Sequence, residues 1–177
     1  MKNDVENALG ALVGLPLSDV SRGANMLMFG FGGPRLIPAH SGGTREVGDF
    51  ALHVQCAWRF RDSSRILIGF NDIYYPADLP WTEPIPDGFD WDVSGANRCD
   101  RFFKSFMAAH KTAPIRVISA VADDVGGFHL GFSDGYELDV FPDTGMPNEV
   151  WRLFRPCTSG HFVLPHNTPD DPVVAGV

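Results

Sequence analysis

The residue pair with the clearest potential for proton-transfer chemistry is His129 and Asp139, in the stretch FHLGFSDGYELDVFPD, residues 128–143. If residues 128–132 and 136–140 are two strands of a hairpin with a three-residue loop, these side chains stand opposite each other on the polar face. A carboxylate that orients an imidazole can support general-base catalysis. The pattern ties no serine or cysteine to the pair, so we favour a structural cross-strand pair and assign no catalytic residue.

The three cysteines give little support for thiol or metal chemistry. Cys56 is expected on the apolar face of a strand and Cys99 on the apolar stripe of a helix, so both are predicted to lie in the core. Cys157 lies in a turn near His161 and is the one thiol with potential reactivity, although an ordinary loop residue is favoured. An odd number of cysteines without C-x-x-C spacing favours a reducing, cytoplasmic location.

Other motifs that carry chemistry are weak. The six histidines have neither H-x-H nor H-E-x-x-H spacing, and the glycine-rich segments lack the Lys-Ser or Lys-Thr of a phosphate-binding loop. We therefore expect neither a metal nor a cofactor. The dipeptides Trp58-Arg59 and Trp151-Arg152 are interpreted as a core tryptophan beside an exposed arginine, not as a platform for stacking nucleic-acid bases.

The connector NDIYYPADLPWTEPIPDGFDWD, residues 71–92, is the segment best suited to bind a partner. It is too long and proline-rich for an ordinary strand connection, and it contains no Lys or Arg. Its aromatic residues could anchor a partner and its carboxylates could accelerate the encounter with a basic one. Equally, the aromatic residues could cover a sheet edge while the acids aid solubility. The predicted partner-binding residues are Asp72, Tyr74, Tyr75, Trp81, Glu83, Asp87, Phe89, Asp90, Trp91 and Asp92.

The elements that position these residues are read from the alternation of apolar and polar side chains. A loop of Ser133–Gly135 keeps the apolar residues of both hairpin strands on one face, and Gly135 would take the left-handed position after a type I turn. The core-facing set is Phe128, Leu130, Phe132, Tyr136, Leu138 and Val140.

A similar pattern occurs earlier in the chain. At an offset of 101, Leu17 matches Ile118, Val20 matches Val121, and Phe29-Gly30-Phe31 matches Leu130-Gly131-Phe132. After an insertion at residues 34–49, three further segments match: Phe50-x-Leu52-x-Val54 with Tyr136-x-Leu138-x-Val140, Trp58-Arg59-Phe60 with Trp151-Arg152-Leu153, and Ile66-Leu67-Ile68 with Phe162-Val163-Leu164. The pattern predicts two antiparallel four-strand meander units. Internal duplication explains the match economically, and a chance likeness between two meanders is the alternative.

One main amphipathic helix is predicted between the units, at about residues 96–111, with Ser94 as its N-cap and an ion pair between Asp100 and Lys104. Its apolar stripe is Cys99, Phe102, Phe103, Phe106 and Met107. A short N-terminal helix is predicted near residues 4–13. The expected fold is a single α+β domain, residues 1–165, with a flexible tail at 166–177. Both one continuous sheet and a sandwich fit the pattern.

Composition restricts the function classes. A chain of 177 residues with 44% hydrophobic content can bury a sizeable core, and its net charge of -8 disfavours nucleic acid as a partner and favours a cationic protein. No apolar run approaches the roughly 20 residues of a membrane-spanning helix. The N-terminus lacks the features of a signal peptide. We expect a soluble cytoplasmic protein that does not contact a membrane.

In size, acidity and the repeated motifs F-x-L-x-V, G-F and W-R, the chain resembles the immunity proteins of bacterial toxin systems, which are small acidic inhibitors of often basic toxins. It is also similar to small bacterial proteins with the pattern D-G-x-x-L-x-V-x-P and E-x-W-R-L, here residues 134–142 and 149–153. This second match covers mainly the C-terminal third and implies no activity. The first implies a non-enzymatic protein that binds and neutralises a toxin, with no contact residue carried over.

Two other functions remain as alternatives. The first is a small-ligand-binding protein or hydrolase-like enzyme with a pocket between the two sheet units, using His129, Asp139, His53 or Arg59. The second is a subunit of a larger assembly, in which the connector would be an oligomer contact.

Overall fold

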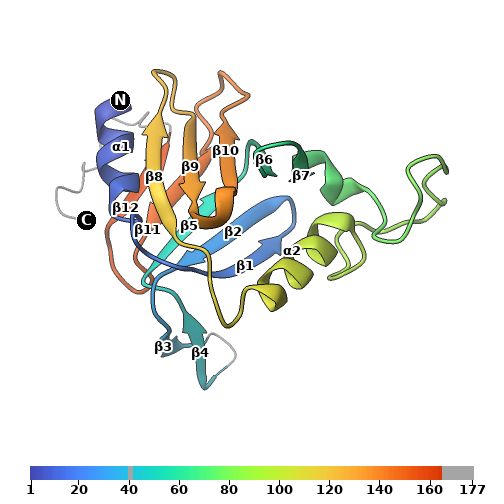
Figure 1. Ribbon diagram of the computed structural model, residues 1–177, viewed down its shortest axis with the longest axis horizontal. Coiled ribbons are helices and arrows are strands. Elements are labelled where there is room, and N and C mark those ends of the chain that lie inside the picture. Colours follow the sequence, from blue (N-terminus) through green and yellow to red (C-terminus); the bar gives the residue numbers. More distant parts are fainter. Residues whose placement is uncertain (40–41, 165–177) are drawn as a thin grey trace.

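The computed structural model describes residues 1–39 and 42–164, which form two five-stranded antiparallel sheets, a separate hairpin and two α-helices (Figure 1). In spatial order, the first sheet contains β1 (Leu17–Gly23), β2 (Met26–Phe31), β5 (Phe50–Val54), β11 (Trp151–Phe154) and β12 (His161–Leu164). The second contains β7 (Ile66–Gly69), β6 (Ala57–Arg61), β10 (Glu137–Phe141), β9 (Phe128–Phe132) and β8 (Val117–Ala122). The remaining elements are the helices α1 (Lys2–Gly10) and α2 (Arg98–Ala109), the hairpin of β3 (Arg35–Pro38) and β4 (Thr44–Val47), and the 3₁₀ segments η1 (Phe70–Tyr74) and η2 (Ser133–Gly135). The predicted tail, residues 166–177, lies outside the described residues.

The α+β prediction with antiparallel strands is confirmed, but the sheets are five-stranded and neither is a four-strand meander from one half of the chain. Each sheet combines three strands of one half with two strands of the other. After β5 the chain bends at Gln55 and Cys56 and enters the second sheet, where β6 pairs with β10. Such corners let one continuous run of strand-forming residues serve two sheets.

The residue matching between the halves holds for the inner strands. Phe29 pairs with Leu52 in the first sheet, as Leu130 pairs with Leu138 in the second. For β1 the offset of 101 is wrong by one residue, because the ladder starts at Leu17 in one half and at Val117 in the other. Both ladders have a bulge directly after these residues. Because both halves have this bulge, the shift arises in the loop to the next strand: Arg22 pairs with Leu27 across four residues, whereas the equivalent Ala122 pairs with Phe128 across five.

The last strand of each half is also shifted relative to the prediction. Ile68 lies opposite Phe60, and Phe162 lies opposite Leu153, so Phe162 corresponds to Ile68 and not to Ile66. A shift of two residues keeps the same side chains on the same face, so the apolar pattern fits both registers equally well.

The two halves meet at the starts of β1 and β8. The backbone N–H of Leu17 donates to the carbonyl of Ile115 at 2.9 Å, and the N–H of Val117 donates to the carbonyl of Leu15 at 3.0 Å. This reciprocal pair of bonds relates the two halves by an approximate twofold arrangement.

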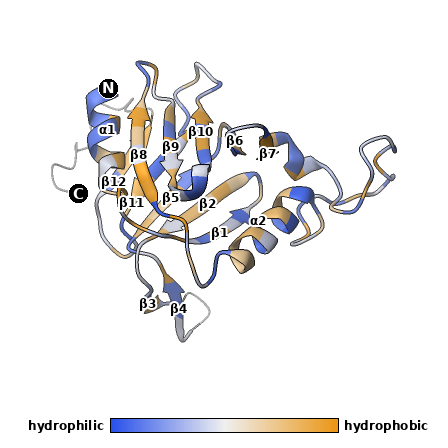
Figure 2. Ribbon diagram, viewed as in Figure 1, coloured by the Kyte–Doolittle hydropathy of each residue, from blue (hydrophilic) through white to orange (hydrophobic). Residues whose placement is uncertain are grey.

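The two sheets form a sandwich, with one hydrophobic core shared by their inner faces and both helices. Hydrophobic residues run along the central strands (Figure 2). Phe31 of the first sheet stacks on Phe132 of the second, with ring centroids 6.5 Å apart. Trp58 and Trp151 are buried, as predicted, whereas the arginine after each is half-buried and pairs with an acid, Arg59 with Asp139 and Arg152 with Glu149.

The helices cover opposite ends of the sandwich. The helix α1 begins and ends earlier than predicted and packs against β8, where Glu6 accepts the N–H of Ala122 at 3.1 Å. The helix α2 packs against β1, and its predicted apolar stripe is confirmed. Neither helix is long and apolar enough to cross a membrane, as far as the structure describes the chain.

The N-cap prediction for α2 is wrong. The cap is Asn97, whose side-chain oxygen accepts the N–H of Asp100 at 2.8 Å, and its amide group also donates to the carbonyl of Trp91 at 2.9 Å. Asn97 caps the helix in place of Ser94, because its buried side chain satisfies two backbone groups at once. The Asp100 carboxylate is bound by Arg22 of β1, and the predicted pair with Lys104 is replaced by this bond.

The hairpin of β9 and β10 has the predicted three-residue loop. His129 lies opposite Asp139, and the N–H of Phe132 donates to the carbonyl of Tyr136 at 2.8 Å. The turn type differs from the prediction, because Asp134 at φ 61° precedes Gly135 at φ 77° and both are left-handed. Aspartate is one of the few residues besides glycine that visits this region readily.

Candidate partner-binding site

The predicted binding segment is an arm that leaves the body of the protein after η1 and returns to the start of α2 (Figure 1). Its base is closed by two backbone hydrogen bonds, from Ala77 to Ala96 at 2.8 Å and from Arg98 to Tyr75 at 2.9 Å. Between these bonds, residues 78–95 form what we call the acidic arm. Backbone bonds from Glu83 to Pro80 and from Phe89 to Pro86 fold it into successive turns.

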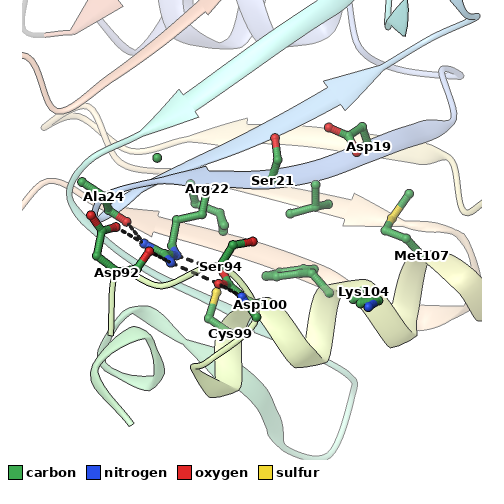
Figure 3. A pocket seen from close by; sticks show the side chains of 15 residues that line it. Asp19, Ser21, Arg22, Ala24, Asp92, Ser94, Cys99, Asp100, Lys104 and Met107 are labelled. Carbon is green, nitrogen blue, oxygen red and sulfur yellow. Dashed lines mark hydrogen bonds and ion pairs between the residues drawn. The ribbon is translucent and has the colours of Figure 1, made fainter. Parts of the chain in front are cut away.

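The returning end of the acidic arm is fixed to the sandwich by Arg22, which comes from β1. Its guanidinium binds both carboxylate oxygens of Asp100 at 2.9 and 3.0 Å, and it also binds the carboxylate of Asp92 at 3.0 Å (Figure 3). It lies 5.7 Å from the centre of the Trp91 ring and donates to the Trp91 carbonyl at 3.3 Å. The Arg22 side chain is only 5% exposed. A buried charge with this many partners holds the three segments it joins in one arrangement.

Arg22 and Asp100 stabilise each other's charged forms. Hydrogen bonding to Asp100 raises the pKa of Arg22 against the effect of burial. Burial alone would raise the pKa of Asp100, but hydrogen bonds from Arg22 and the Gly95 N–H outweigh it and lower that pKa. Sequence reasoning missed Arg22, because its partners Asp92 and Asp100 lie 70 and 78 residues further along the chain and no local pattern links them.

The ten predicted binding residues separate into two groups. Those near the base are used by the protein itself: Tyr74 packs on Trp91 with ring centroids 5.1 Å apart, and Asp72 accepts the Gly69 N–H at 2.8 Å. Asp92 belongs to both groups, because it pairs with Arg22 and its side chain is still 57% exposed. The others extend into solvent or lie half-buried along the arm: Tyr75, Trp81, Glu83, Asp87, Phe89 and Asp90.

The outer part of the acidic arm combines apolar and acidic side chains. Trp81 is 85% exposed and Ile85 is 41% exposed. Glu83 and Asp87 are exposed beside them. Tryptophan is enriched among the residues that contribute most of the binding energy of protein interfaces, so an exposed tryptophan beside Ile85 and two carboxylates is a candidate contact residue.

A cleft of about 610 Å³ lies next to the base of the acidic arm, between β1 and α2 (Figure 3). Residues 19–24 form one wall, and α2 forms the other with Cys99, Asp100, Phe103, Lys104 and Met107. Asp92, Ser94 and Gly95 of the arm close one end. No sequence signal indicated this cleft, because its two walls come from opposite halves of the chain.

The His129 and Asp139 pair lies on the outer face of the second sheet. Asp139 is buried and accepts hydrogen bonds from His129 at 2.6 Å, Arg59 at 2.7 Å and Arg61 at 3.0 Å. Burial alone would raise the pKa of Asp139, but these three bonds outweigh it and lower that pKa. Arg61 also pairs with Glu137. The network satisfies the carboxylate from three sides, as expected for a structural cluster.

This cluster has no nucleophile beside it in the part of the chain that the structure describes. The adjoining hollow, about 220 Å³, is lined by Val121, Ala122, Asp123, Phe128, His129, Asp139, Val140 and Phe141. His53 lies on the outer face of the first sheet, opposite Arg152, where burial lowers its pKa to about 4. Of the residues proposed for an enzyme pocket between the sheets, His129, Asp139 and Arg59 do meet, but on the outer face of the second sheet. His53 lies on the other sheet, and the shared core fills the space between the sheets.

The cysteines lie where the sequence predicted. Cys56 and Cys99 are buried, and burial raises the pKa of each thiol to about 12, which disfavours reactive thiolates. Cys157 is exposed. No group of three potential metal ligands occurs among residues 1–39 and 42–164.

Comparisons with protein-family models, with curated proteins and with solved structures returned no significant match for this chain. The function must therefore be argued from the geometry of the site.

Proposed function

We propose that this protein is a non-enzymatic binding module whose acidic arm engages a basic surface of a partner protein. The observation that carries the proposal is Trp81, which is 85% exposed on an arm anchored to the sandwich through the buried Arg22. Anchoring the arm before binding reduces the conformational entropy that association must remove. An exposed tryptophan on such an arm is well suited to be an energetic anchor of an interface.

The charge of the arm selects the partner. Residues 78–95 contain no Lys or Arg, and the chain as a whole carries a net charge of -8. Of the acidic residues in the arm, Asp78 pairs with the exposed Arg101 at 2.9 Å, whereas Glu83 and Asp87 remain exposed. Carboxylates at the rim of an interface raise the association rate with a basic protein and repel acidic competitors.

Within this proposal, an inhibitor of a basic toxin is the form that the sequence resemblance favours. A small acidic protein that anchors an exposed aromatic residue on an acidic arm suits a role in which binding alone blocks the target. We infer a cytoplasmic location, which the three free cysteines support.

Photo-crosslinking tests the proposal. Trp81 is replaced by a photoreactive phenylalanine derivative, and the matched control carries the same group at Leu36, which is 73% exposed on β3. Irradiation in the source cell should link position 81, but not position 36, to one protein with a basic surface. Equal products from both positions, or none from position 81, would contradict the proposal.

A further inference from the structure

We propose that the cleft between β1 and α2 binds an extended segment of the partner, which adds to the free edge of β1 as a further antiparallel or parallel strand. This inference rests on the proposed function, since it supplies a second contact for the same basic partner. The segment that suits the cleft alternates apolar and basic side chains.

The edge of β1 is open. β1 is the outermost strand of the first sheet, and its consecutive residues Asp19–Gly23 line the cleft, together with Ala24 directly after the strand. Every second residue of an edge strand directs its N–H and C=O away from the neighbouring strand. Within the described residues, the backbone groups of Asp19–Gly23 make no hydrogen bond outside the ladder with β2. These groups therefore have free hydrogen-bonding capacity on the side of the cleft.

The corresponding edge of the second sheet is not open in this way. At β8, Glu6 of α1 accepts the N–H of Ala122, and the N–H of Gly14 donates to the carbonyl of Val117 at 2.8 Å. β1 and β8 occupy equivalent places in the two halves. Because the edge of β8 forms hydrogen bonds with groups outside its sheet, an edge strand in this place can do so, and β1 has the same capacity.

The opposite wall of the cleft provides pockets for side chains. Both Figure 1 and Figure 3 place α2 beside β1, on the side away from β2. The half-buried Met107 and the edge of the buried Phe103 form the apolar part of that wall. Asp19 and Asp92 lie towards opposite ends of the cleft (Figure 3). In an added strand, alternate side chains would contact the apolar wall, and those between them would reach solvent near the carboxylates. This arrangement of backbone edge and helix is the geometry of strand addition.

The cleft is continuous with the acidic arm, and this determines the choice of occupant. Asp92, Ser94 and Gly95 belong to the arm and also close one end of the cleft. A partner held by the arm would therefore present its nearest segment to β1. Asp92 already pairs with Arg22, but its side chain is 57% exposed, which leaves it able to accept a basic segment at that end as well.

The experiment uses the full chain and a synthetic peptide of about nine residues that alternates lysine and valine. Backbone NMR should show shift changes along Asp19–Gly23 and slower amide exchange there, because new hydrogen bonds protect outward-facing N–H groups. A second peptide with alternate amides methylated should bind at least about tenfold more weakly, since it loses these bonds. No change at β1 at millimolar peptide overturns the inference. Shifts at Phe103 and Met107 without protection of β1 would mean that the peptide contacts α2 without pairing with β1, and would also overturn it.

Matched charge changes on α2 give a variant test that does not depend on altering a strand. Lys104→Glu replaces a positive charge in the cleft wall, and Lys111→Glu makes the same change at an exposed position outside it. Lys104→Glu should tighten binding of the basic peptide by about threefold or more beyond Lys111→Glu. Equal effects would place the peptide elsewhere and overturn the inference.

A proline pair tests the backbone directly. Val20→Pro removes one N–H from β1, and Ala120→Pro is the equivalent change in β8, since Val20 lies opposite Phe29 as Ala120 lies opposite Leu130. Provided that circular dichroism shows both to be folded, only Val20→Pro should lose the peptide. If position 81 still crosslinks to a partner while the peptide ignores β1, the proposed function stands and the strand-addition inference fails.

Discussion

At the scale of single residues, Arg22 joins β1, the acidic arm and α2 through a side chain that is 5% exposed. Removing one partner of a buried ion pair leaves the other charge without compensation. The contribution of Arg22 to the free energy of unfolding can therefore be compared with that of an exposed arginine of the same protein.

We predict that Arg22→Met lowers the free energy of unfolding by about 3 kcal/mol, because Asp100 would stay largely buried without its guanidinium. The control is Arg101→Met, which breaks the exposed pair with Asp78 and should cost less than about 1 kcal/mol. Urea unfolding at neutral pH measures both. Equal losses would mean that Arg22 does not anchor the arm.

Asp139 makes the free energy of unfolding depend on pH. Its pKa lies below the ordinary value, so the unfolded chain takes up a proton at a higher pH than the folded chain. The stabilisation by the Asp139 carboxylate is therefore complete above about pH 4, which is the ordinary pKa of an aspartate, and it is lost as the pH falls towards the pKa of the folded state. We predict that Asp139→Asn destabilises the protein more at pH 7 than at pH 3, whereas the exposed Asp124→Asn changes little at either. Urea unfolding at both pH values decides this, and a pH-independent effect of Asp139→Asn would contradict it.

Residue-level features were predictable where they depended on near neighbours. The pairing of His129 with Asp139 followed from loop length, and the burial of Trp58 and Trp151 followed from strand alternation. The role of Arg22 was not predictable, because it depends on contacts between the two halves of the chain.

At the scale of elements, tight turns depend on backbone conformations that glycine adopts most easily. Gly126 has φ 92° and its carbonyl accepts the indole N–H of Trp151 at 2.9 Å, so this turn is tied to the first sheet. A Cβ at Gly126 would overlap the side chain of Leu164, whereas one at Gly135, with φ 77°, meets no atom within 4 Å.

We therefore predict that Gly135→Ala costs about 1 kcal/mol, from backbone strain alone. Gly126→Ala should cost about 2–4 kcal/mol, because overpacking adds to the same strain. Thermal or urea unfolding of the two variants gives the comparison. A smaller loss for Gly126→Ala than for Gly135→Ala would contradict the packing between this turn and β12.

The two helices and the hairpin of β9 and β10 were predicted because their patterns are local, with apolar residues repeating at the helical or the strand period, whereas the hairpin of β3 and β4 was not. The bulges after Leu17 and Val117 were not, since an inserted residue leaves the alternation on either side intact. The cap of α2 was assigned to Ser94 because the tertiary bond from Asn97 to Trp91 leaves no trace in the sequence.

At the scale of the whole molecule, the exchange of strands between the halves makes them interdependent. The strands β6 and β7 of the first half complete the second sheet, and β11 and β12 of the second half complete the first. The sequence does not reveal this exchange, because the corner at Gln55 and Cys56 looks like an ordinary short connection between strands. The repeat was visible, but its assignment to separate units was wrong for this reason.

We predict that residues 1–95 and 96–177, produced separately, are each unfolded. Each fragment would hold only three strands of one sheet and two of the other, so the shared core would be exposed. Mixed in equal amounts, they should regain the circular dichroism and dispersed NMR spectrum of the full chain. A folded spectrum from either fragment alone would contradict the exchange of strands.

The association rate of the partner captured through position 81 tests the central claim, that the acidic arm draws a basic protein to this molecule. The arm variant Glu83→Lys with Asp87→Lys is compared with Glu46→Lys with Asp124→Lys, which changes the net charge equally at exposed sites elsewhere. At low ionic strength the arm variant should associate about tenfold or more slowly than the wild type, with the control reduced far less, and salt should narrow the difference. Equal rates for the two variants, or a deficit that salt leaves unchanged, would contradict the claim.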